Sequence, residues 1–107
     1  DDHVAAALRF IRARASEGIA VADVLREVPI SRRRLEQRFR RALGRTILAE
    51  IRRVRIATAS RLLAETDLPL ARVAVRSGFR TPQYFSQSFR KATGRTPASY
   101  RRLYRYG

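Results

Sequence analysis

The sequence has no cysteine among its 107 residues and only one histidine, His3. Disulfide bonds, thiol catalysis and the usual structural zinc sets are thereby excluded, and one histidine leaves little for a metal site or a general base. One histidine and scattered acids also provide no combination of nucleophile, base and orienting group. We therefore expect no enzyme, no catalytic residues, no metal site and no cofactor.

Long apolar runs are missing as well. No stretch reaches the ~18 residues of a membrane span, and no secretory signal pattern opens the chain. A content of 45% apolar and 31% charged residues is ordinary for one folded domain of this length, so we expect a soluble cytoplasmic protein without a membrane partner. The chain begins with Asp1 instead of methionine, which indicates a piece of a longer protein.

Acidic residues disappear toward the end of the chain. The 24 Arg and Lys outnumber the nine Asp and Glu to give a net charge of +15, and no acid follows Asp67. All bases except Lys91 are arginine, whose planar fork suits phosphate and guanine, although genome base composition explains that bias equally well. Such a bias does not remove acids. A polyanion is therefore the expected partner, with an acidic membrane surface as the competitor.

Helical periodicity dominates the sequence, and no stretch alternates with a period of two. Ser and Thr caps, Pro at helix starts and Gly stops predict an all-α fold of seven helices. These are expected at about residues 2–15, 21–28, 32–43, 47–65, 70–77 and 82–93, and from residue 97 on. The start of the second helix lacks a good cap. Helical wheels place Ala42 and Ala92 inward, and Tyr104 and Tyr106 are expected in a frayed basic tail.

An internal repeat is the strongest signal in the sequence. When residues 31–46 are shifted by 50 positions onto residues 81–96, seven of the sixteen pairs are identical. The identical pairs are Gln37/Gln87, Phe39/Phe89, Arg40/Arg90, Ala42/Ala92, Gly44/Gly94, Arg45/Arg95 and Thr46/Thr96. Each copy consists of a short helix, a tight turn and a longer helix, which is the helix-turn-helix pattern.

The repeat predicts the organisation of one domain, residues 1–107. A first helix-turn-helix unit (residues 1–45, the first unit) and a second (residues 67–107, the second unit) are joined by a linker helix at 46–66. A straight helix over residues 47–65 would span about 28 Å. Successive major grooves of B-DNA lie about 34 Å apart, so this helix is expected to hold two recognition helices near that separation, and also to serve as a central core helix.

At this point the sequence resembles the C-terminal DNA-binding domain of the AraC/XylS family of bacterial transcription regulators. The resemblance covers about residues 21–102. It is carried most specifically by Leu70, Val73, Ala74, Gly78, Phe79, Tyr84, Phe85, Phe89, Arg90, Gly94, Thr96, Pro97, Tyr100 and Arg101, and more weakly by Ser31, Leu35, Phe39 and Gly44, with Arg55, Ala59, Leu62 and Leu63 in the linker. Residues 28–40 look most similar to the xylose-regulator branch.

The resemblance implies sequence-specific binding of double-stranded DNA and regulation of transcription, with activation as the expected direction. It also implies an effector-binding domain elsewhere in the full-length chain, and contact with RNA polymerase. One residue departs from the family pattern. Pro29 stands in the first turn where the family commonly has glycine, as Gly78 stands in the second. Proline cannot adopt positive φ, so we expect the first turn to follow another backbone path.

Outward and flanking positions of the two recognition helices, together with residues at their ends, supply the candidate DNA contacts. Base edges are met by the N-terminal half of such a helix, and phosphates by its ends and flanks. The expected base-contacting residues are Arg33, Glu36, Gln37, Gln83, Ser86 and Gln87, which are also the positions that the resemblance implies. The expected phosphate-contacting residues are Arg32, Arg40, Arg41, Arg45, Thr46, Arg80, Arg90, Lys91, Arg95 and Thr96.

Two other classes compete with this interpretation. A less specific nucleic-acid or RNA-binding module would favour aromatic side chains exposed for base stacking, whereas the aromatics here fall on inward positions. A basic helix bundle that binds a membrane surface or a partner would need an exposed apolar helix face, and no helix offers one beyond its core stripe. The sequence therefore favours double-stranded DNA as the partner.

Overall fold

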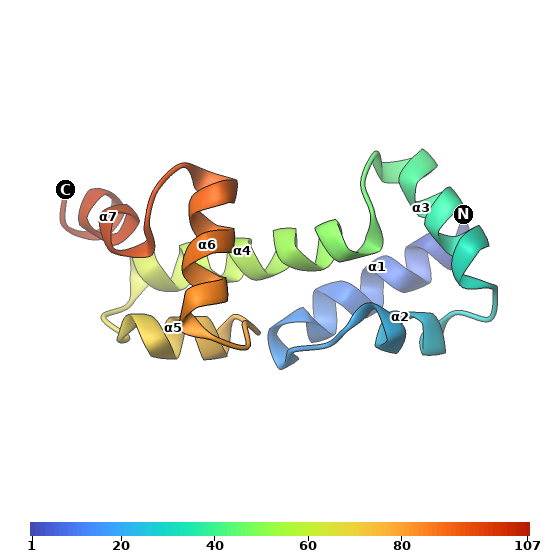
Figure 1. Cartoon of the computed structure of the whole chain (residues 1–107), viewed down its shortest axis with the longest axis horizontal. Helices are drawn as coiled ribbons and strands as arrows, with labels where there is room; N and C mark the ends of the chain where they lie inside the picture. Colours follow the sequence, from blue (N-terminus) through green and yellow to red (C-terminus); the bar gives the residue numbers. More distant parts are fainter.

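The computed structural model describes all 107 residues and contains seven α-helices and no strand, which confirms the all-α prediction (Figure 1). A 3-10 turn at Ala15–Glu17 follows the first helix, and a π-helical turn at Arg102–Tyr106 follows the last. The helices are α1 (Asp2–Arg14), α2 (Val21–Glu27), α3 (Arg32–Leu43), α4 (Ile47–Glu65), α5 (Leu70–Arg76), α6 (Pro82–Thr93) and α7 (Pro97–Arg101). None of them combines the length and the apolar character needed to cross a bilayer.

The predicted caps set the helix boundaries. Side-chain oxygens accept a hydrogen bond from the N–H three residues later, at Ser31 for α3, Thr46 for α4, Thr81 for α6 and Thr96 for α7. Gly44 and Gly94 end α3 and α6 in the left-handed conformation. The start of α2 is held by its third residue instead, because Asp23 accepts from Ala20 N at 2.7 Å. Each cap satisfies a backbone donor that the helix itself cannot.

Two separate hydrophobic cores lie along α4. The first core contains Val4, Ala7, Ile11, Ala15, Val24, Val28, Leu35, Phe39, Ile47 and Ile51, and the second contains Ala59, Leu63, Val73, Ala74, Phe79, Phe85 and Phe89. The beginning of α4 thus belongs to the first core and its end to the second. The helix is at once a linker and a core element, as its spacing predicts.

The molecule is elongated along this helix, with extents of 45 × 22 × 21 Å. Figure 1 shows α4 running along the long axis, with α1, α2 and α3 gathered at its start and α5, α6 and α7 at its end. Consequently α3 and α6, the second helices of the two repeats, are carried toward opposite ends of one rigid element.

The two helix-turn-helix turns differ, as Pro29 predicts. Gly78 has φ +96°, and no residue other than glycine has a positive φ. In the first turn Ile30 N donates to Val28 O at 2.9 Å, which closes a three-residue turn around Pro29. In the second turn Phe79 N donates to Ala74 O at 3.0 Å. The inserted Arg80 and the positive φ of Gly78 make the second turn one residue longer.

The inward placement of Ala42 and Ala92 is wrong, because both residues are exposed. They lie in the last turns of α3 and α6, and Ala92 borders an open groove between α4 and α6. The next residues, Leu43 and Thr93, are half-buried instead. The wheel assumes that one face stays covered over the whole length of a helix, which fails at helix ends.

The C-terminal residues are docked, so the prediction of a frayed tail is also wrong. Arg105 Nε donates to Asp67 Oδ1 at 2.7 Å and the Tyr106 hydroxyl bonds the same carboxylate oxygen. The Arg105 hydrogen bond, assisted by that of Tyr106, lowers the pKa of Asp67 to about 2. Arg101 Nη1 donates to Leu68 O at 2.6 Å. Part of the basic charge of the second unit therefore holds its own backbone and the end of α4.

Candidate nucleic-acid interface

Five of the six predicted base-contacting side chains are free on the surface. They are exposed, and none makes a hydrogen bond within the chain: Arg33 and Gln37 of α3, and Gln83, Ser86 and Gln87 of α6. Burial of Leu35 and Phe39 fixes the outward face of α3, and burial of Phe85 and Phe89 does the same for α6. The two copies of the repeat thus present polar side chains at matching helix positions.

Glu36 and Arg45 have other contacts. Both are half-buried, and Glu36 Oε1 accepts from Ile47 N at 3.1 Å. Arg45 Nε donates to Glu50 Oε1 at 2.6 Å. Glu36 therefore ties α3 to the start of α4, and Arg45 ties the turn between the two helices to α4. We leave both out of the interface proposed below. A helical wheel could not reveal these contacts, because it shows neither the turn between the helices nor the helix beyond it.

The remaining predicted phosphate-contacting arginines and Lys91 are exposed and have side chains without internal partners. They are Arg32, Arg40, Arg41, Arg80, Arg90, Lys91 and Arg95. At the turn from α6 to α7, Arg90 and Arg95 line one open hollow together with Thr93, Gly94, Thr96 and Ser99. Its lining includes no carboxylate, so the hollow favours an anion. The Thr46 and Thr96 hydroxyl oxygens cap α4 and α7.

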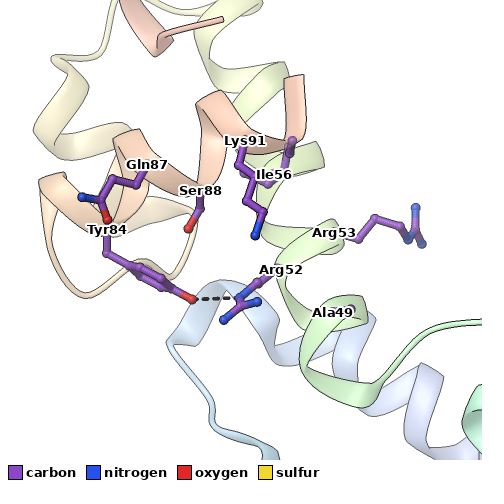
Figure 2. Close-up of a pocket in the computed structure, with 9 residues that line it drawn as sticks. Ala49, Arg52, Arg53, Ile56, Tyr84, Gln87, Ser88 and Lys91 are labelled. Atoms are coloured by element: carbon purple, nitrogen blue, oxygen red, sulfur yellow. Dashed lines mark hydrogen bonds between the residues drawn. The ribbon is translucent and has the colours of Figure 1, made fainter. Parts of the chain in front are cut away.

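A groove between α4 and α6 extends this surface (Figure 2). It is lined by Ala49, Arg52, Arg53 and Ile56 from α4 and by Tyr84, Gln87, Ser88, Lys91 and Ala92 from α6. Arg52 and Tyr84 point toward one another across it, and Arg52 Nε donates to the Tyr84 hydroxyl at 2.9 Å. Gln87 also lines the neighbouring hollow with Gln83 and Ser86, so the groove is continuous with the exposed face of α6.

Arg52 was not among the residues that the sequence predicts for the interface. The sequence does contain a pattern that includes Arg52, since residues 49, 52, 53 and 56 have the spacing of one helix face. Only the fold shows that α6 packs beside this face and forms a groove with it. Arg52 and Lys91 line the same groove as Gln87, which adds positive charge to the surface that carries this candidate base-contacting residue.

Glu50 is a buried carboxylate held by two arginines. Its side chain is 1% exposed and accepts from Arg45 Nε at 2.6 Å and from Arg53 Nε and Nη2 at 2.9 Å each. The hydrogen bond from Arg53 lowers the pKa of Glu50 below its ordinary value, and Arg45 adds to the effect against the opposing influence of burial. Three donors thus keep the carboxylate ionised inside the protein.

This carboxylate should make stability depend on acid pH. Because the pKa of Glu50 is lower in the folded state, its contribution is present above pH ~4.5 and is lost as the pH falls through the folded value. E50Q should cost about 1–2 kcal/mol at pH 7, since the amide oxygen still accepts from the arginines while the amide nitrogen cannot, and both arginines are partly hydrated. Urea unfolding at pH 7 and pH 3 measures both. An equal loss on acidification in wild type and E50Q would contradict this assignment.

Comparison with known proteins was consistent with this geometry. The family model described as a helix-turn-helix domain matches residues 24–103. The xylose operon regulatory protein of Escherichia coli (strain K12) is 40% identical over 101 residues, which make up 94% of this chain and 26% of that protein. The chain therefore spans about a quarter of the length of that regulator.

Two solved structures of similar size share the whole fold. The C-terminal domain of AraT, a response regulator from Geobacillus stearothermophilus, is 30% identical with a TM-score of 0.91, over 96% of this chain and 86% of that one. The DNA-binding domain of the global transcriptional factor AdpA, solved in complex with a target DNA, is 32% identical with a TM-score of 0.90, over 96% of this chain and 93% of that one. The chain belongs to the family of AraC-type helix-turn-helix DNA-binding domains of transcription regulators.

Proposed function

We propose that this chain binds a specific duplex DNA sequence by inserting α3 and α6 into two adjacent major grooves, in order to regulate transcription. The observation that carries the proposal is the repetition of exposed hydrogen-bonding side chains without internal partners on two separate helices, α3 beside the start of α4 and α6 crossing α4 farther along it. A 19-residue α4 gives about 28 Å between its ends, and the molecule is 45 Å long. These lengths suit grooves that lie about 34 Å apart.

The chemistry of the exposed side chains suggests which bases they favour. Arg33 suits a bidentate pair with O6 and N7 of guanine, whereas Gln37, Gln83 and Gln87 suit N6 and N7 of adenine. Ser86 bonds either donors or acceptors and adds less selectivity. We therefore assign base recognition to these five residues.

The DNA backbone is assigned to the exposed bases around them. Arg32, Arg40 and Arg41 flank the recognition helix of the first unit, and Arg80, Arg90, Lys91 and Arg95 flank that of the second. Arg52 joins this group because it lines the same groove as Gln87 and Lys91. Such contacts fix orientation and supply affinity that falls with salt.

For the full-length protein we propose a cytoplasmic transcription regulator, with an effector-binding domain outside this chain, activation as its action and RNA polymerase as a further partner. The relatives named above are regulators of transcription, and this chain covers 26% of the xylose operon regulator. We assign the chain itself to binding and not to catalysis.

Footprinting tests the two-groove proposal. Duplexes would be selected from a random pool by this chain and then cleaved with hydroxyl radicals in its presence. We expect two protected blocks on one face of the helix, about one turn apart. Binding should survive an excess of random DNA and of RNA at moderate salt. Protection of a single block would contradict docking of both units, and loss of binding to the RNA competitor would favour the less specific nucleic-acid module.

Gln87→Ala and Arg90→Ala should fail in different ways. Q87A should lose about 1–3 kcal/mol on its selected site and discriminate less at one base position. R90A should weaken binding to every sequence alike and reduce the slope of log K against log salt by about 0.9, which corresponds to one released counterion. Salt titrations with selected and substituted duplexes measure both. An altered base preference in R90A with an unchanged salt slope would refute its assignment to phosphate.

A further inference from the structure

Arg55 occupies the stretch of α4 between the two cores. Its side chain is buried, and the residue is 6% exposed. Nε donates to Ala15 O at 2.9 Å and Nη2 donates to Ile19 O at 2.5 Å. No carboxylate pairs with it, and burial lowers its pKa. The two carbonyls belong to the turn that follows α1. The hydrogen bonds of this buried arginine therefore fix the position of that turn relative to α4.

The turn of the second unit packs on the same spot. A Cβ added to Gly78 would lie 2.3 Å from Ala15 O and 2.9 Å from Arg55 Nε. A Cβ added to Gly18 would lie 3.8 Å from Gly78 O, so the two backbones face one another at close range. We call the meeting of residues 15–19, Arg55 and Gly78 the junction.

The junction is the principal direct contact between the two units. Neither core contains residues of the other unit, and α4 is the only element that enters both. Elsewhere the units lie apart along the 45 Å axis. The angle between them is therefore set by one helix and by the polar contacts of this junction, without a shared hydrophobic core.

We propose that Arg55 is a positioning residue that fixes the angle between the two units and thereby the base-pair spacing between the two recognised blocks. This inference rests on the two-groove proposal. With a lever of about 14 Å, half the length of α4, a swing of 10° displaces a recognition helix by about 2.5 Å. The rise of one base pair is about 3.4 Å, so a small loss of angular control is comparable to one step of DNA register.

The test measures how affinity depends on the number of base pairs between the two DNA blocks. Duplexes carrying both footprinted blocks would be varied by one and two base pairs between the blocks, and each block would also be tested alone. Wild type should show a sharp optimum. R55M keeps an unbranched, shorter side chain that donates to neither carbonyl, so its preference for the optimal spacing over a one-base-pair change should shrink about tenfold while single-block binding is retained. R55K, which can reach one carbonyl, should fall between the two.

Arg61→Ala is the matched control, because Arg61 is an exposed arginine of α4 without an internal partner. It removes the same charge and should leave the spacing curve unchanged. Amide exchange in both cores establishes folding of each variant, and R55K carries the test if R55M is unfolded. A folded Arg55 variant with the wild-type spacing curve would overturn the proposed role of Arg55 at the junction and would leave the two-groove proposal intact. A wild-type chain without a spacing optimum would overturn two-groove binding, and this inference with it.

Discussion

Phe89→Ala should lower the free energy of unfolding of the second unit by about 3–5 kcal/mol, the range for deleting a buried aromatic ring. Phe89 is fully buried in the second core. Its ring meets Phe85 edge-on with centroids 5.7 Å apart and Tyr100 at 5.2 Å with an interplanar angle of 89°. These contacts add to the loss from burial, since edge-to-face pairs are worth about 0.5–1.5 kcal/mol each.

Because the two cores are separate, the effect of F89A should be confined to the second unit. F89A should accelerate amide exchange in α5, α6 and the end of α4, and leave the buried amides of α1 and α3 protected. Phe39→Ala at the equivalent repeat position should give the reverse pattern. Phe39 is also fully buried, but it makes no ring contact of the kind that surrounds Phe89. Loss of protection throughout the molecule in either variant would show that the two units unfold as one.

Gly78→Ala should cost about 2–5 kcal/mol. The residue has φ +96°, where a side chain is strained by about 1–2 kcal/mol. The added Cβ would also fall 2.3 Å from Ala15 O, an atom of the backbone that cannot swing aside. Displacing packed neighbours of this kind adds about 1–3 kcal/mol. The turn must therefore open, and the α1 end of the junction must move with it.

Gly44→Ala separates the cost of backbone strain from the cost of the close contact with Ala15. Gly44 has φ +72° and no atom within 4 Å of an added Cβ, so only the backbone strain should appear. Urea unfolding of both variants gives the difference, which measures the close approach of the two backbones. Equal losses at the two positions would mean that the Ala15 contact relaxes freely. G78A should in addition weaken binding to the two-block duplex more than G44A does.

The local structure could be predicted from the sequence because each boundary has a short-range cause. The bounds of α4 follow from the Thr46 cap and the apolar spacing of the helix, and the ends of α3 and α6 follow from Gly44 and Gly94. The 50-residue repeat alone was enough to predict that the two units have equivalent helices. Even the odd first turn followed from the fixed φ of Pro29.

The destinations of the charged side chains could not be predicted in the same way. A guanidinium carries five donors and suits phosphate, carboxylate and backbone carbonyl alike, so sequence does not distinguish Arg33 from Arg55. Glu36 stands on the flank of the α3 wheel and Arg45 lies just beyond its end, and only the path of the turn to α4 brings them against its first residues. Arg52 gained its neighbours through the packing of α6 on α4. The contacts of Glu36 and Arg52 join residues on different helices, and that of Arg45 joins a turn to a helix.

The separation of the two cores also has a consequence for the growth of the chain on the ribosome. The first core closes within residues 4–51 and the second within residues 59–89, so both are built from contacts between nearby parts of the chain, which form quickly. Synthesis proceeds from the N-terminus at about 5–20 residues per second, so the first core leaves the ribosome before the second and has time to fold ahead of it. When the second unit emerges, it meets a turn at Ala15 that is already formed, and the angle between the two units is the last feature of the molecule to be set.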